Sequence, residues 1–245
     1  MTTSQNIAPD DLKEKYRRIY ERLVVEYGQP KWRQHLPPVD ELVSTILSQS
    51  TSDTNRDVGF YALKERYPEW ELVLQAPVAD IRETIRPAGL ANQKAPRIQT
   101  ALHEIKEEAG EMSLDFLNQM SKEEAMEWLE ALPGVGPQTA SIVLLFAFGR
   151  PAFPVDTHVH RLTKRLGLIG PKVSAEKAHG ILESMGEPDT YYAYHLNLIR
   201  HGRQICHARN PKCQVCFLQH ECSYYQNLDH GSPPNESPKR KKPNN

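Results

Sequence analysis

All four cysteines of the chain fall within seventeen residues near its C-terminal end, and this crowding constrains the fold more than any other feature. They are Cys206, Cys213, Cys216 and Cys222, separated by six, two and five residues. Four soft thiolates this close can converge on one metal centre, whereas a disulfide framework would spread its cysteines along the chain. The spacing favours an iron–sulfur cluster. A four-cysteine zinc site remains the alternative, although such sites usually pair two C-x2-C knuckles and only one is present.

The rest of the chain has the composition and periodicity of a globular helical protein. Its 245 residues are 39% hydrophobic, which suffices for one large domain or two small ones. Apolar residues repeat every three or four positions in many segments, for example from Leu12 to Tyr27, where Gly28 ends the pattern. Ser121 and Glu124 form a capping-box pair before another such segment. Sustained strand-type alternation is absent, so we predict an all-α fold of about ten helices.

Neither end of the chain carries a segment expected to cross a membrane. Residues 1–9 are polar, and no stretch reaches the ~18 apolar residues that a spanning helix needs. We therefore expect a cytoplasmic protein, associated with the nucleoid if it acts on DNA. Residues 226–245 have no Phe, Trp or Tyr and include the basic run 239–242, so we predict a disordered tail that either adds DNA affinity or only aids solubility.

The net charge of −1 gives no sign of a nucleic-acid partner, but its distribution is uneven. Residues 150–225 hold ten Lys and Arg against six Asp and Glu, whereas residues 1–149 are acidic. The positive charge thus lies in the half that carries the cysteines. This is compatible with binding to phosphates and equally with an ordinary solvated surface.

A glycine-rich turn joins two helical patterns at residues 132–140, LPGVGPQTA. Gly134 and Gly136 permit positive φ and leave the turn's backbone amides uncovered, and Pro137 suits the first position of the second helix. Together with Val135 they make a helix start that can bind a phosphate. A short glycine turn between helices is more often only a turn.

Three motifs together resemble the endonuclease III family of helix-hairpin-helix DNA glycosylases. They are the 132–140 turn, the VDTH motif around Asp156, and the cysteine loop that follows His201, Gly202 and Arg203. The resemblance spans roughly residues 38–224. It implies a 4Fe-4S cluster on the four cysteines, which is structural in that family, and removal of a damaged or mismatched base from duplex DNA.

The resemblance also implies an all-α helix-hairpin-helix glycosylase fold with two domains. Residues 32–150 would form a six-helix barrel domain that contains the hairpin. Residues 1–31 would add an N-terminal helix to the iron–sulfur cluster domain of residues 151–225. The DNA and the flipped base would lie in the cleft between the two domains.

Asp156 and Gln138 are the two candidate catalytic residues. Asp156 precedes an expected helix, Thr157 to Leu166, and by itself reads as an N-cap. In the family this Asp is the catalytic carboxylate, and the two roles can coexist. Gln138 stands where bifunctional members carry a Schiff-base lysine, and an amide is not nucleophilic. We therefore predict a monofunctional enzyme that uses water activated by Asp156, with Gln138 positioning that water, contacting the base, or only packing in the hairpin.

The resemblance assigns further DNA contacts to loops outside the hairpin. Leu90 matches a leucine that wedges into the duplex as the base flips, although it could equally be a core residue. Ser50 aligns with a glutamine that enters the duplex, and Gln49 is adjacent to it. The basic side chains expected on the DNA backbone are Arg161, Arg209 and Lys212.

Three other functions remain open on the sequence alone. The chain could be a non-catalytic helix-hairpin-helix protein that only holds DNA, a bifunctional glycosylase/lyase that uses another lysine, or a zinc-stabilised interaction domain with no DNA role. We expect a monomer that binds duplex DNA. The base that it excises is not determined, because the residues of the pocket cannot be placed without coordinates.

Overall fold

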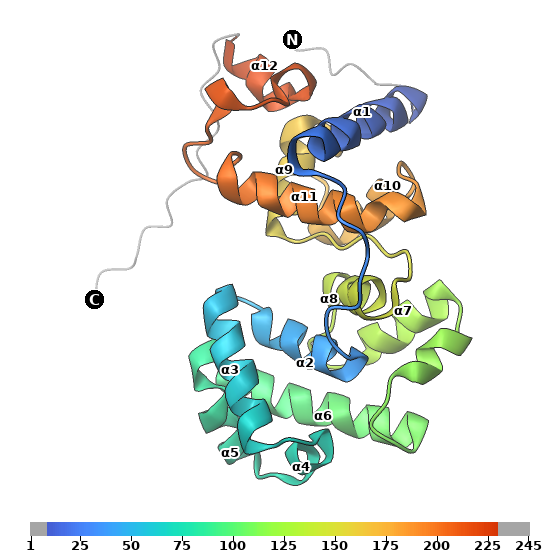
Figure 1. The fold of residues 1–245 in the computed structure, drawn as a ribbon, viewed down its shortest axis with the longest axis vertical. Coiled ribbons are helices and arrows are strands. Elements are labelled where there is room, and N and C mark those ends of the chain that lie inside the picture. Colours follow the sequence, from blue (N-terminus) through green and yellow to red (C-terminus); the bar gives the residue numbers. More distant parts are fainter. Residues whose placement is uncertain (1–8, 230–245) are drawn as a thin grey trace.

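The chain folds into two helical lobes, each built around its own hydrophobic core (Figure 1). A computed structural model describes residues 9–229, which contain twelve α-helices and no β-strand. The predicted all-α fold is confirmed for these residues. Helices α2 to α8 form the lower lobe in Figure 1, and helices α1, α9, α10, α11 and α12 form the upper lobe.

The lower lobe packs seven helices around one core. Their bounds are α2 Pro38–Ser48, α3 Asp53–Arg66, α4 Trp70–Gln75, α5 Val78–Thr84, α6 Ala91–Ala109, α7 Lys122–Ala131 and α8 Pro137–Ile142. The long helix α6 runs across the lower half of this lobe, above α4 in the view of Figure 1. It buries Ile98, Leu102 and Ile105, which follow the period of one helix face. The polar residues between them lie on the other side of α6 and face solvent.

The upper lobe joins the two ends of the described chain. Its helices are α1 Pro9–Tyr27, α9 Thr157–Leu166, α10 Ala175–Glu183, α11 Tyr191–Gln204 and α12 Ser223–Asp229. Helix α1 packs on α11 through Ile19 and Leu23, both fully buried in the upper core. Residues 28–37 then lead down to α2 (Figure 1). The lobe thus depends on segments almost two hundred residues apart.

A single continuous segment passes from the lower core to the upper core. Helix α8 continues into a π-helical turn, Val143–Ala147. Val143 and Leu144 are buried in the lower core, whereas Leu145 and Phe146 are buried in the upper core. A π turn inserts an extra residue and so changes the direction in which successive side chains point. This segment ties the hairpin rigidly to the lobe that carries Asp156.

Several predicted helix ends are confirmed, and others differ. Gly28 is left-handed at φ 87° after α1, and Ser121 with Glu124 forms the predicted capping box of α7. The structure has two more helices than expected, because α4 and α5 are only six and seven residues long and too short to show a periodicity. Residues 226–229, assigned to the tail, complete α12, while the basic run 239–242 lies outside the described residues.

Within residues 9–229, no helix combines the length and the hydrophobicity that crossing a lipid bilayer requires.

Candidate active site and iron–sulfur centre

The hairpin between α7 and α8 is a tight turn in which one glycine is required. Gly134 has φ 80°, and a Cβ added there would lie 2.6 Å from Cδ of Arg97 on α6. Val135 anchors the turn, since its side chain is buried in the lower core and its N–H donates to the Leu132 carbonyl. Gly136, in an extended conformation, is the N-cap of α8. A DNA phosphate approaching here would meet backbone rather than side chains.

Asp156 is the N-cap of α9, as the sequence predicts. Its Oδ1 accepts a hydrogen bond of 2.7 Å from the backbone N–H of Val159. The other carboxylate oxygen makes no hydrogen bond or ion pair with any described residue, and the side chain is partly exposed. Capping therefore uses one oxygen and leaves the second available to a substrate.

Basic and imidazole side chains surround the carboxylate. His158 lies close to Asp156, and burial lowers the pKa of His158, so its ring is neutral at pH 7. Helix α11 approaches closely because residue 202 is glycine: a Cβ there would lie 2.6 Å from Nδ1 of His158. Arg203, the next residue, is also near this ring. Asp156 therefore has the neutral His158 ring and the Arg161 guanidinium as neighbours.

One ion pair connects this region to the lower lobe. Arg203 on α11 forms an ion pair of 2.8 Å with Asp53 at the start of α3. The loop before α3 is in turn held to the hairpin, because Nε2 of Gln49 donates to the Gly134 carbonyl at 2.8 Å and lies 3.4 Å from Oγ1 of Thr139. The 49–53 loop, the hairpin and the Asp156 region therefore lie together where the two lobes meet.

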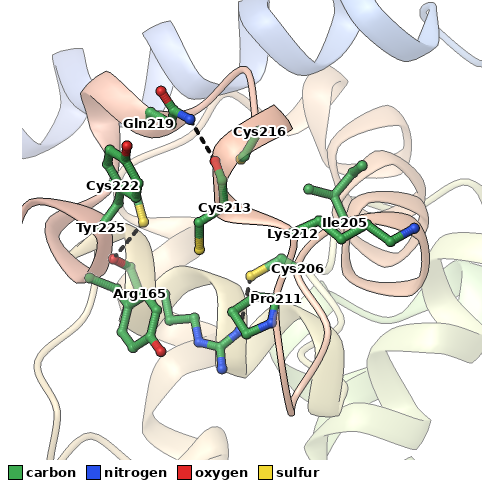
Figure 2. A pocket seen from close by; sticks show the side chains of 11 residues that line it. Arg165, Ile205, Cys206, Pro211, Lys212, Cys213, Cys216, Gln219, Cys222 and Tyr225 are labelled. Atoms are coloured by element: carbon green, nitrogen blue, oxygen red, sulfur yellow. Dashed lines mark hydrogen bonds between the residues drawn. The ribbon is translucent and has the colours of Figure 1, made fainter. Parts of the chain in front are cut away.

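The four cysteines surround a common space at the far end of the upper lobe (Figure 2). They line one pocket together with Arg165 and Tyr225, and none forms a disulfide. Nowhere in residues 9–229 do three His, Cys, Asp or Glu side chains converge closely enough to hold a single metal ion. Four thiolates that share one pocket could hold an iron–sulfur cluster or a single zinc ion.

Burial affects the protonation of three of the four cysteines. Burial, reinforced by the neighbouring cysteines, raises the pKa of Cys216 to about 11. The pKa values of Cys213 and Cys222 are raised for the same reason. Thiols with raised pKa values stay protonated unless a metal centre draws off their protons. The four residues thus have the chemistry to hold an iron–sulfur cluster.

Comparisons with known proteins agree with this geometry. Residues 43–188 match the family described as HhH-GPD superfamily base excision DNA repair protein, and residues 206–222 match the iron-sulfur binding domain of endonuclease III. The chain belongs to the HhH-GPD superfamily. It is a DNA glycosylase of the endonuclease III type and carries a 4Fe-4S cluster, and the segment that matches the cluster-binding domain contains all four cysteines.

Individual relatives cover most of this HhH-GPD chain. Endonuclease III of Thermotoga maritima is 33% identical over 202 residues, 82% of this chain and 90% of that protein. Endonuclease III of Rickettsia prowazekii is 37% identical over 186 residues, covering 76% and 83%. A solved non-covalent endonuclease III–DNA complex superposes with a TM-score of 0.75 at 27% identity, covering 89% of this chain and 99% of that one. That complex shows DNA bound to a protein with the same fold as this chain.

Gln138 lies in the first turn of α8 and is exposed. Lys94 on α6 contacts the end of α2, just before the 49–53 loop, and is therefore a candidate for an alternative nucleophile. Its side chain is only 1% exposed, and Nζ donates to the carbonyls of Leu47 and Ala88 at 2.7 and 2.8 Å. Lys94 therefore serves the structure and is not free to attack a sugar.

Three non-glycine residues of the described chain adopt a left-handed backbone, and all lie in loops predicted to face DNA. They are Ser50 at φ 55°, Leu90 at φ 51° and Asn210 at φ 49°. Such a conformation costs about 1 kcal/mol or more and is retained where the surroundings impose it. Leu90 is 49% exposed, so the alternative that it belongs to the core is wrong. Its role as a wedge stays a prediction.

Lys94 also explains how two of these loops keep their shape. The Leu47 carbonyl ends α2 three residues before Ser50, and the Ala88 carbonyl lies two residues before Leu90. One buried ammonium group therefore holds the backbone next to both strained residues. The sequence analysis missed Lys94, and a lysine at a helix position facing the core was the signal that could have revealed it.

The three basic residues predicted to bind DNA differ in their surroundings. Arg209 and Lys212 are exposed in the loop between the first two cysteines. Arg161 instead donates to the carbonyls of Gly202 and Cys206 at 3.1 and 2.9 Å, and burial lowers its pKa. These hydrogen bonds give Arg161 a structural role, because they fix the start of the cysteine loop. Its contact with DNA stays a prediction.

A buried polar stripe on α2 is a second feature that the sequence analysis missed. Glu41, Ser44 and Thr45 are buried but lie on the helix face opposite the lower core. Oε2 of Glu41 has no hydrogen-bond partner in the described chain, and burial raises the pKa of Glu41 to about 7. A polar i, i+3, i+4 pattern inside an apolar helix was the available signal.

Proposed function

We propose that this glycosylase is monofunctional and excises a damaged or mismatched base with water activated by Asp156, leaving an intact abasic site. The observation that carries the proposal is the residue at position 138. It is an exposed glutamine at the start of the hairpin's second helix, where the resemblance expects the lysine of bifunctional members. An amide cannot form the Schiff base that strand cleavage requires.

The uncommitted oxygen of Asp156 supports the hydrolytic step. As the glycosidic bond breaks, positive charge develops on the sugar, and a nearby carboxylate can stabilise it or take a proton from the attacking water. The first oxygen remains bonded to Val159 N–H throughout, which holds the carboxylate in place. Gln138 would then position the water or contact the base through its amide.

We expect no borohydride-trapped protein–DNA adduct from the natural protein, because no amine replaces the lysine at position 138. Incubation with a lesion duplex should give strand breaks only after alkali. Gln138→Lys should restore partial strand cleavage and trapping, provided that the new amine reaches the sugar carbon. Gln138→Ala is the control: it carries no amine and should give no trapping, and slower excision by this variant would reflect loss of the amide contact. Efficient trapping by the natural protein would mean that another lysine acts and would refute the monofunctional proposal.

We expect Leu90→Ala to slow excision of normally paired target bases by roughly tenfold, and of mismatched or unpaired ones much less. The exposed Leu90 side chain would otherwise fill the space left by the extruded nucleotide. Single-turnover excision on matched duplex pairs measures this difference. Leu72, a leucine 44% exposed on α4, supplies the control Leu72→Ala. Equal losses on both substrates would count against a wedge.

The substrate class follows from this reaction. The protein would act as a monomer on duplex DNA that contains a damaged or mismatched base, and therefore at the nucleoid. A panel of duplexes with uracil, thymine opposite guanine, oxidised pyrimidines and alkylated purines, each read with and without alkali, identifies the base.

A further inference from the structure

One buried histidine contacts a cysteine of the cluster loop. The glycosylase reaction does not use this contact. His201 lies on α11 and is 2% exposed. Its Nε2 lies 3.4 Å from Sγ of Cys216, one of the four cluster ligands. Its Nδ1 lies 3.0 Å from the hydroxyl oxygen of Tyr27, the last residue of α1. The three side chains therefore form a continuous line from the N-terminal helix to a cluster sulfur.

The direction of both hydrogen bonds follows from what each group can donate. A phenol keeps its proton at neutral pH, and burial raises the pKa of Tyr27 to about 12. Tyr27 therefore donates to Nδ1, and a neutral imidazole then carries its single proton on Nε2. That N–H points at Cys216, whose thiolate in a cluster can only accept. The ring of His201 is thus oriented by one neighbour and presents its donor to the other.

Aromatic packing fixes the ring in this position. The Phe217 ring lies 5.0 Å from the His201 ring and 5.7 Å from the Tyr27 ring, both nearly perpendicular. Arg200 covers the other side of Tyr27 at 4.7 Å. A donor held this firmly loses little entropy when it bonds to the sulfur. The contact is therefore expected to persist in solution.

We propose that His201 is a positioning residue for the cluster: it donates a hydrogen bond to the Cys216 thiolate and raises the cluster's reduction potential, with Tyr27 of α1 setting its orientation. A donor to a ligating sulfur withdraws negative charge from the cluster and so favours the state with one more electron. The proposal concerns the cluster alone, so its outcome is independent of whether the protein is monofunctional.

Arg165 also approaches a cysteine sulfur, but its guanidinium makes other hydrogen bonds as well. Nη1 of Arg165 lies 3.2 Å from Sγ of Cys206, and the same guanidinium donates to the carbonyls of His207 and Ala208 at 2.7 and 3.0 Å. Replacing Arg165 would disturb the loop as well as the potential. Within the described chain, the His201 side chain hydrogen-bonds only to Tyr27 and Cys216, and it therefore gives the cleaner test.

The test is a redox titration of the cluster in the anaerobically purified, full-length holoprotein, with iron content and visible absorption recorded for each variant. His201→Phe keeps a buried ring but removes the donor. We expect its one-electron potential to fall by an amount equal to about a tenfold change in the ratio of reduced to oxidised cluster, about 59 mV. His201→Gln keeps an N–H near the position of Nε2 and should retain most of the wild-type potential.

His179→Gln is the matched control, because His179 is a buried histidine of the same lobe whose Nδ1 bonds to the Phe153 carbonyl and not to a sulfur. Its potential should equal that of the wild type. If His201→Phe does not retain its iron, Tyr27→Phe decides, with a smaller shift in the same direction. A wild-type potential in an iron-replete His201→Phe, or in Tyr27→Phe when His201→Phe is empty, would overturn the proposal. So would equal shifts in His201→Phe and His201→Gln.

Discussion

Asp156→Asn should lower the rate of base excision by ~10² or more while the fold and the DNA affinity stay close to those of the wild type. The structure gives the reason for this separation. An asparagine Oδ1 can still accept the hydrogen bond from Val159 N–H, so the cap of α9 is kept. What disappears is the charge, and with it the ability to stabilise a sugar cation or to deprotonate water.

Single-turnover excision, DNA binding by anisotropy and thermal unfolding should be measured on the same preparations. Asp156→Ser provides a second capping side chain without a carboxylate and should lose excision in the same way. Ser121→Ala is the converse control, because it removes the cap of α7, costs about 1 kcal/mol of stability, and should leave excision intact. Full excision by Asp156→Asn would leave this residue as a cap only and would remove the central catalytic proposal.

Loss of the cluster should have the largest effect on stability. Residues 205–222 contain only two short 3-10 turns, so the loop has little regular structure of its own. Structural metal centres of this kind contribute on the order of 10 kcal/mol to local folding. Chelation of iron, or Cys216→Ser, is therefore expected to unfold this loop and to loosen α1, which it holds through the Arg18–Glu221 ion pair of 3.0 Å.

Hydrogen exchange of the α1 and α11 amides, measured with and without iron, tests this expectation. The holoprotein should contain about four irons per chain. Arg209→Ala lies in the same loop, but its side chain is exposed and does not line the cysteine pocket, so this variant should keep its iron and its protection. Unchanged exchange after complete loss of iron would show that the cluster does not stabilise the lobe, and stoichiometric zinc without iron would contradict the cluster itself.

Several features of this protein depend only on residues that are close together in the sequence. Helix caps depend on a few neighbouring residues, so Gly28, Ser121 and Asp156 could be assigned to their caps from the sequence, and all three assignments are confirmed. The ligand set of the cluster is equally local, because its four cysteines lie within one loop. The hairpin glycines also follow a short pattern. Each of these features needs only contacts between residues that are close in sequence.

The tertiary structure alone decided which side chains are free to act. Gln49 donates a hydrogen bond to the hairpin 85 residues away. The Arg161 guanidinium donates to carbonyls 41 and 45 residues away. Leu90 is exposed and Lys94 is buried, although both stand in one short motif. A sequence pattern shows what a side chain can bond to, but its partner is set by which helices pack against it. That packing depends on the burial of apolar surface across the whole chain, and no single motif contains it.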